Sequence, residues 1–325
     1  MTTLLNYVVD QKGWVQHKRV TNLARAQHRY RFRVLSVREF KWAWKFRLLR
    51  DQPVVFSTWR VVHQLMKDRP NLFSEPDFDH FLGAVTSHST IGGGLDPLNP
   101  IPGRTPEEAF ELAVGLLRQF KVVTVNSKIL FDLLSPALDR VMYCANGVDC
   151  EFFTPADGKP SRMPLRVGWV GKIRGPKNFP VVKEALEHLE ETGKFKPEVI
   201  AVDKDMRNRK LNASEMRDFF QNIDFYLCAS WNEGTPNPAL EAAACGVPVV
   251  TTRVGNMPEL IDPGINGYFV EPTVASIVER FLEIARMPEG RYISMSKNIR
   301  QSARDLWSWE SRIGGFLSAF DALID

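Results

Sequence analysis

Short apolar runs alternate repeatedly with helix-like stretches along this 325-residue chain. Continuous apolar runs indicate strands buried on both faces, which occur mainly in parallel sheets covered by helices. In the first half, strands are predicted at about 4–9, 30–37, 54–56, 81–87, 122–125 and 141–144. In the second half, they are predicted at 165–170, 198–202, 225–229 and 248–252. The alternation therefore predicts an α/β fold with two doubly wound sheets.

Helical patterns separate these runs, and a polar stretch divides the two series. Helices are predicted at about 15–28, from Trp59 onward, after Thr105-Pro106-Glu107-Glu108, after Ser127, at 178–191, 213–221, 238–245 and 274–286, and throughout the last forty residues. Residues 151–163 contain two prolines and a glycine and are the best linker candidate. Doubly wound sheets bind ligands at the carboxyl ends of their strands, so the site is expected there.

The most informative stretch for chemistry is 225–261, where a buried strand ends at Ser230 and a helix begins near Pro238. The N-terminus of that helix favours an anion. Glu233 and Glu241 stand eight positions apart, one in the loop and one in the helix. Because carboxylates accept hydrogen bonds from sugar hydroxyls, the pattern fits a nucleotide sugar with hydroxyls at both ends and a diphosphate between them.

A second stretch, 167–179, places cations at the end of another strand. The strand ends at Gly171, and Lys172, Arg174 and Lys177 follow in a glycine- and proline-containing loop before a helix. Such cations are suited to holding a diphosphate leaving group. A third stretch, Asn146-Gly147-Val148-Asp149, is by itself only a turn signal.

Taken together, these motifs resemble the retaining glycosyltransferases of family four, which have the GT-B fold of two facing Rossmann-like domains. The family's E-x7-E motif corresponds to Glu233 and Glu241, its diphosphate loop to Gly171-Lys172 and Lys177, and its NGVD turn to 146–149 followed by Phe153-Thr154-Pro155. The final Trp-containing helices resemble the family's C-terminal helix, which crosses back to the first domain. The resemblance implies an acceptor-side domain at 1–157, a nucleotide-sugar domain at 158–304 and a returning helix at 305–325.

The resemblance also implies a role for each site residue. Glu233 would contact the hydroxyls of the transferred sugar, Glu241 the ribose hydroxyls, and Lys172 and Lys177 the diphosphate. His88 matches the family's histidine that touches the donor sugar. The other donor-binding residues would be Gly13, Arg174, Gly234, Thr235 and Asn237.

The chemistry implied is transfer with retention of the anomeric configuration, without metal or cofactor other than the donor substrate. A donor phosphate oxygen would take the acceptor's proton, so no dedicated protein base is required. Two positions depart from the family pattern. Lys172 stands where arginine is usual, which loses bidentate binding, and Pro236 removes one backbone donor from the donor loop.

The net charge of +4, from 42 basic and 38 acidic residues, is unevenly distributed. Residues 1–50 hold 12 Lys and Arg against Asp10 and Glu39, whereas the remainder is slightly acidic. Residues 12–50 could therefore contact an anionic membrane surface or nucleic acid, or simply form a solvated face. Segment 38–50 mixes Trp and Phe with Lys and Arg, but its apolar residues alternate at 40, 42, 44 and 46, which does not give a clean helical face.

Cysteine usage and hydropathy bear on the compartment. The four cysteines have no zinc-ligand spacing and are too few for a disulfide framework, and no long apolar segment is present. These features favour a reduced, cytoplasmic protein, and peripheral binding at the inner membrane surface is compatible with this expectation. The expected acceptor is a lipid-linked or envelope glycan. The alternatives are a glycosyltransferase acting on nucleic acid, such as a modified DNA base, and a catalytically idle nucleotide-sugar or nucleic-acid binding protein. The oligomeric state is not predicted.

Overall fold

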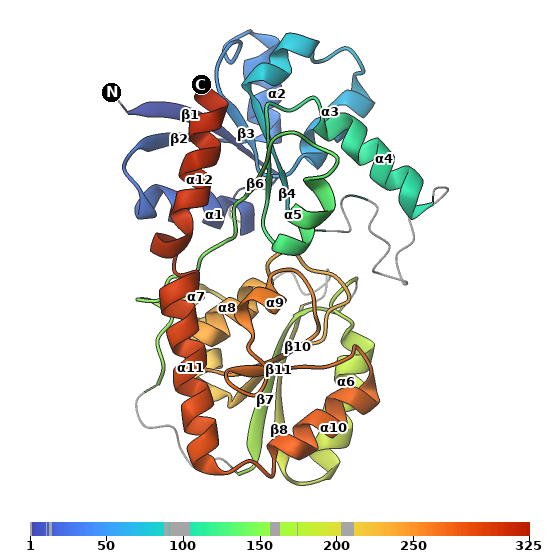
Figure 1. The fold of residues 1–325 in the computed structure, drawn as a ribbon, viewed down its shortest axis with the longest axis vertical. Coiled ribbons are helices and arrows are strands. Elements are labelled where there is room, and N and C mark those ends of the chain that lie inside the picture. Colours follow the sequence, from blue (N-terminus) through green and yellow to red (C-terminus); the bar gives the residue numbers. More distant parts are fainter. Residues whose placement is uncertain are drawn as a thin grey trace. The chain divides into compact units, whose positions relative to one another are not determined.

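The computed structural model describes residues 2–10, 12, 15–87, 91, 105–156, 163–173, 175–202 and 211–325. These residues form two compact units (Figure 1). The first contains the described residues up to Asn146 together with Trp309–Asp325, and the second contains Gly147–Ser308. Each unit is a parallel sheet flanked by helices, which confirms the predicted α/β class with two doubly wound sheets.

The sheet of the first unit has the strand order β2-β1-β3-β4-β5-β6, and every pairing is parallel. The strands are β1 (Thr3–Val9), β2 (Tyr30–Ser36), β3 (Val54–Phe56), β4 (Phe81–Val85), β5 (Val122–Val125) and β6 (Val141–Tyr143). A strand that is buried on both faces has a continuous apolar run rather than alternating polar and apolar residues. Strands β3, β4 and β5 are buried along their whole lengths.

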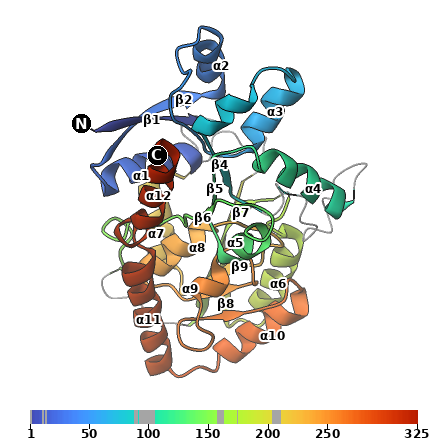
Figure 2. The same ribbon diagram turned by 45° about the horizontal axis from the view of Figure 1, so that its top comes forward.

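Helices cover both faces of this sheet. They are α1 (Val15–Ala26), α2 (Val37–Lys45), α3 (Arg60–Asp68), the 3₁₀-helix η1 (Glu75–His80), α4 (Pro106–Leu117), α5 (Lys128–Leu134) and α12 (Trp309–Ile324). One core contains buried side chains of α2, α3, α4 and α5, and the other contains those of α1 and α12. Helices α1 and α12 lie side by side (Figure 2).

Residues Val37–Lys45 form helix α2, and its apolar side chains lie on two faces, as their alternation indicated. Ser36 caps the helix: its hydroxyl accepts from the Glu39 amide at 3.3 Å, and its own amide donates to the Glu39 carboxylate at 2.7 Å. The alternating aromatic residues divide between two faces, because Phe40 and Trp44 are buried while Trp42 is exposed. The i, i+4 spacing of Phe40 and Trp44 is therefore the one that faces the core.

The sheet of the second unit has the order β11-β10-β9-β7-β8, again with parallel pairings. Its strands are β7 (Leu165–Lys172), β8 (Phe195–Val202), β9 (Phe225–Cys228), β10 (Val249–Thr251) and β11 (Gly267–Phe269). Its helices are α6 (Phe179–Glu191), α7 (Ala213–Asn222), α8 (Asn237–Ala244), α9 (Met257–Leu260), α10 (Val274–Ile284) and α11 (Glu289–Trp307). Strand β11, only three residues long, was not predictable from the sequence pattern.

The chain returns to the first unit through Ser308, which separates α11 from α12. Helix α12 buries Phe316, Phe320 and Leu323 against the first sheet. Asp321 accepts from the Tyr30 hydroxyl, and burial together with this contact raises the pKa of Tyr30 to about 12. Residues Trp309–Asp325 thus belong to the first unit, although the whole second unit precedes them in the chain. Within the described residues, no helix has the length and hydropathy needed to cross a membrane.

Candidate functional site

The candidate site lies at the carboxyl edge of the second sheet, where the loops after β7 and β9 meet. These strands are parallel neighbours, so both loops leave the same edge. The amide of Trp231 donates to the carbonyl of Pro176 at 2.8 Å and joins the two loops directly. Pro176 and Trp231, which are 55 positions apart in the sequence, are thus held together by a backbone hydrogen bond.

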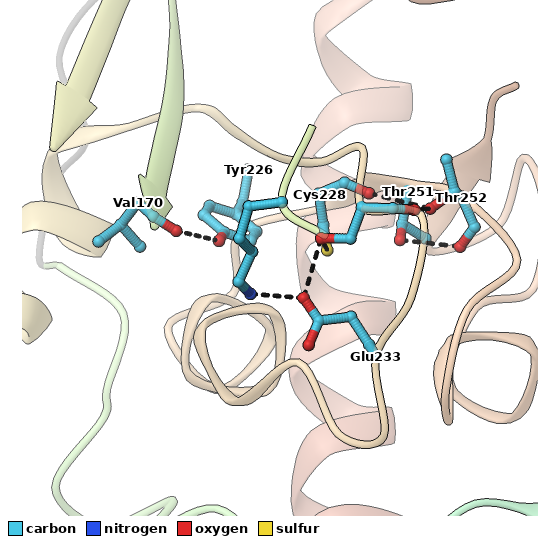
Figure 3. A network of polar contacts seen from close by, with 8 residues as sticks. Val170, Tyr226, Cys228, Glu233, Thr251 and Thr252 are labelled. Atoms are coloured by element: carbon cyan, nitrogen blue, oxygen red, sulfur yellow. Dashed lines mark hydrogen bonds and ion pairs between the residues drawn. The ribbon is translucent and has the colours of Figure 1, made fainter. Parts of the chain in front are cut away.

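This join brings Lys177 and Glu233 into contact. The Lys177 Nζ lies 2.5 Å from Glu233 Oε1, and the Ser230 hydroxyl donates to the same oxygen at 2.9 Å (Figure 3). The side chains are 21% and 13% exposed, so the ion pair is shielded from most of the solvent but not fully buried. The predicted phosphate-binding lysine and sugar-binding glutamate are therefore direct neighbours.

The surrounding groups determine the charge of the site. Burial lowers the pKa of Lys177, but the Glu233 carboxylate, Cys228 and the hydrogen bond to Glu233 outweigh it, and the net pKa is raised. Burial raises the pKa of the Cys228 thiol and, with nearby Cys228, Glu233 and Glu241, raises that of Tyr226 well above its ordinary value. The Tyr226 hydroxyl donates to the Val170 carbonyl at 3.3 Å. At neutral pH, Lys177 is thus cationic while Cys228 and Tyr226 are uncharged.

A third loop, which follows β10, holds the Glu233 loop in place through hydrogen bonds. The Thr252 hydroxyl donates to the Ser230 carbonyl at 2.6 Å. The buried Asn256 donates its backbone amide to the Gly234 carbonyl at 3.1 Å and its side-chain amide to the Thr235 hydroxyl at 3.3 Å. These roles of Ser230, Thr252 and Asn256 were not predicted, because the only signal in the sequence was their position just after apolar strands.

Pro236 shapes the start of α8. Its φ of −73° and ψ of 82° approximate an inverse γ-turn, and the Asn237 amide donates to the Thr235 carbonyl at 2.9 Å across it. The Asn237 amide is therefore engaged inside the loop. Glu241 lies on α8, one turn beyond its first residue, on the same element that the loop leads into.

The other predicted site residues have different locations. Lys172 is the last residue of β7 and is exposed. Gly234 and Thr235 lie in the loop supported by Asn256. Gly13, His88 and Arg174 lie outside the described residues. Within the described ranges, no three His, Cys, Asp or Glu residues are grouped so as to hold a metal ion.

Residues 164–286 match the family model "Glycosyl transferases group 1". An uncharacterised glycosyltransferase of Methanocaldococcus jannaschii is 28% identical over 149 residues, which cover 46% of this chain and 37% of that protein. A D-inositol 3-phosphate glycosyltransferase of Arthrobacter is 25% identical over 201 residues, covering 53% of this chain and 48% of that protein. The chain thus spans no more than about half the length of these relatives.

Two solved structures resemble the fold over nearly the whole chain. Sucrose-phosphate synthase from Thermosynechococcus elongatus gives a TM-score of 0.73 at 13% identity and covers 99% of both chains. Anabaena HepE, crystallised with UDP and glucose, gives 0.67 at 13% identity and covers 97% of this chain and 99% of its own.

The fold is therefore GT-B, an α/β fold with two Rossmann-like domains. The chain is thus similar to glycosyltransferases, over 164–286 by the family model and over about half its length by the curated relatives.

Proposed function

We propose that the protein is a retaining, metal-independent glycosyltransferase that uses a nucleotide-diphosphate sugar. The observation that carries the proposal is the contact of Lys177 with Glu233 at the carboxyl edge of the second sheet, with Glu241 on the helix that follows. This edge is where doubly wound sheets bind nucleotides. The match of 164–286 to a glycosyltransferase family model supports it.

The contacts of the Lys177–Glu233 ion pair suggest which part of the nucleotide-sugar donor each residue binds. Lys177 has three N–H donors and uses one toward Glu233, so others can reach the diphosphate. Both contacts of Glu233 with Lys177 and Ser230 engage Oε1, and Oε2 is the oxygen we assign to a hydroxyl of the transferred sugar. Lys172 adds a second cation for the diphosphate, and Glu241 accepts from the ribose hydroxyls.

The proposed reaction breaks the bond between the anomeric carbon and the diphosphate oxygen. The acceptor hydroxyl forms its bond on the face that the diphosphate leaves, so the configuration is retained. Its proton passes to the leaving phosphate oxygen. The two lysines stabilise the negative charge that develops there, which is why a metal ion is not required in this scheme.

The donor class is proposed from a structural neighbour, and the acceptor class from the charge distribution of the chain. Anabaena HepE was crystallised with UDP-glucose, so a UDP-sugar is the first donor to test. For the acceptor we propose a lipid-linked or envelope glycan met at the cytoplasmic face of a membrane, since the positive charge is concentrated in the first fifty residues.

Calorimetric titration with UDP-glucose and other nucleotide-diphosphate sugars tests donor binding. Lys177→Ala and Glu241→Ala are each expected to weaken binding roughly tenfold to a hundredfold, the range for hydrogen bonds to charged groups. Lys183→Ala and Glu187→Ala are matched controls, because they form an exposed ion pair at 3.5 Å on α6 of the same unit. Wild-type affinity in both site variants would refute the assignment.

Turnover is tested separately. Slow hydrolysis of the bound donor without acceptor, unaffected by EDTA and releasing the sugar first as the retained anomer by NMR, is the expected result. Tight binding with no hydrolysis or transfer would favour a catalytically idle binding protein instead.

A further inference from the structure

The outward face of α2 and the turn after it carry an unusual group of exposed side chains. We define the α2 surface as Arg38, Trp42, Lys45, Phe46, Arg47 and Leu48, all of which are exposed. Trp42 is 60% exposed, Phe46 54% and Leu48 51%. Among the described residues, no other seven-residue stretch exposes three large apolar side chains. Such a cluster indicates an interaction site.

The apolar part of this surface is continuous. Trp42 and Phe46 are one helical turn apart, and their ring centroids are 5.0 Å apart at an interplanar angle of 51°. The opposite face of α2 already packs into the core through Phe40 and Trp44, so the exposed pair is not part of the fold's own packing.

Positive charge surrounds the apolar side chains. Arg38, Lys45 and Arg47 form no ion pair with any described residue. Glu39, the only acid on α2, is already held by Lys12 at 2.8 Å and by the cap at Ser36. Within the described residues, the positive charge of the α2 surface is therefore not neutralised, and it is available to a partner.

The turn after α2 holds an arginine where glycine is favoured. Arg47 has φ 58°, and the amides of Arg47 and Leu48 donate to the carbonyls of Trp44 and Ala43 at 3.0 and 2.9 Å. This is a Schellman motif, whose left-handed position is usually glycine. In that motif the residue after the left-handed one often packs on the helix, but Leu48 is half exposed. The turn thus presents a cation and an apolar side chain despite an unfavourable backbone conformation.

We propose that the α2 surface binds the surface of an anionic phospholipid bilayer. Trp42, Phe46 and Leu48 enter the boundary between headgroups and acyl chains, and Arg38, Lys45 and Arg47 pair with lipid phosphates. Apolar burial and electrostatic attraction then act together, as in other interfacial segments. A nucleic acid fits less well, because leucine offers no face for base stacking and the two rings already contact each other.

Sedimentation with vesicles tests this proposal. Vesicles of phosphatidylcholine with phosphatidylglycerol are expected to bind the full chain, and binding should weaken with salt or without phosphatidylglycerol. Trp42→Ser with Phe46→Ser should reduce binding by at least about tenfold through lost apolar burial. Leu112→Ser on α4 of the same unit, 43% exposed, is the matched control and should change nothing.

Arg47→Gly separates binding from folding. Glycine relieves the left-handed conformation, so the thermal midpoint should stay or rise, while loss of one cation should weaken vesicle binding about fivefold. Unchanged vesicle binding in this variant and in the double variant would overturn the proposal.

Two further results would also overturn it. One is tighter, salt-dependent binding to single-stranded or duplex DNA oligonucleotides with no vesicle binding. The other is a concentration-dependent dimer that the double serine variant abolishes, which would assign the surface to a second copy. Quenching of Trp42 fluorescence by brominated lipid, lost in Trp42→Phe, would support the depth of insertion.

Discussion

At the residue scale, the contact between Lys177 and Glu233 dominates the site because neither charge is well solvated. The pair lies mostly out of solvent, and Ser230 adds a hydrogen bond to the carboxylate. The Lys177 ammonium and the Glu233 carboxylate stabilise each other chiefly because each compensates a charge that would otherwise be buried alone. Loss of one partner would therefore leave the other as an uncompensated, poorly solvated charge.

Removing one partner should cost more stability than removing both. Lys177→Met leaves Glu233 without its cation and should lower the free energy of unfolding by about 2–4 kcal/mol. Adding Glu233→Gln should restore part of that loss. Urea unfolding measures each step, and Lys183→Met, in an exposed pair, should cost less than about 1 kcal/mol. Equal losses for Lys177→Met and Lys183→Met would contradict the buried pair.

At the element scale, three loops of the second unit form the site, and Gly255 sets how closely two of them approach. Gly255 has φ 54°, and a Cβ there would lie 2.2 Å from the Gly234 carbonyl oxygen. Gly193 has φ 68° with no atom within 4 Å of its would-be Cβ. The two glycines therefore share a backbone conformation but differ in crowding.

Gly255→Ala should displace the 234–237 loop, whereas Gly193→Ala should not. Gly193→Ala is expected to cost about 1 kcal/mol from the left-handed conformation alone. Gly255→Ala should cost at least about 2 kcal/mol more and also weaken donor binding, because the clash is with backbone. Thermal unfolding and calorimetric titration distinguish the two, and similar values would show that the loops can separate freely.

The cap of α2 should make stability depend on acidity. Hydrogen bonds from Lys12 and then from the Ser36 amide and hydroxyl lower the pKa of Glu39 from 4.5 to about 2. A lowered folded-state pKa contributes stability above the unfolded value, and this contribution is lost as pH falls through the folded value. The advantage of wild type over Glu39→Gln should thus be constant above pH 5 and shrink between about pH 4.5 and 2.

Lys12→Met supplies the check on that pH dependence. Without the Lys12 contact, the folded-state pKa of Glu39 should lie closer to 4.5, so the loss still begins there but is complete at a higher pH, and the pH window narrows. Thermal midpoints measured across the acid range would reveal it. A window identical to that of the wild type would mean that the cap alone lowers the Glu39 pKa.

The elements differ in how far sequence alone could predict them. Strands such as β5 and β9 were predictable because burial on both faces leaves a continuous apolar run. Helix α2 was not, since its aromatic residues alternate at 40, 42 and 44 as in a strand, and only the Ser36–Glu39 cap signals a helix. The site residues Glu233 and Lys177 were predicted one by one. Their contact depends on β9 pairing with β7, an order the chain does not spell out locally.

At the scale of the whole molecule, the first unit depends on a helix from a distant part of the chain. Helix α12 buries Phe316, Phe320 and Leu323 in the core that also contains Leu5 and Val20. Its Gly315 lets the helix approach closely, because a Cβ there would lie 2.5 Å from the Tyr143 carbonyl oxygen.

Deleting 309–325 should therefore unfold the first unit and spare the second. Three buried side chains at roughly 1.5–3 kcal/mol each approach the whole stability of a domain, about 5–15 kcal/mol. Calorimetry should show one transition lost, and limited proteolysis should leave fragments within 147–308. Phe320→Ala should cost about 3–5 kcal/mol, while Leu306→Ala, 55% exposed, should cost little. Survival of both transitions after the deletion would refute this dependence.

The return of α12 also sets an order of events during synthesis. Residues 147–308 leave the ribosome before α12 does, although the strands of the first unit leave earlier still. The first unit must then wait with the apolar face of β1 and α1 uncovered until the whole second unit has been made. The second unit can complete its fold first, and the unfinished first unit is the part of the nascent chain that most needs a chaperone.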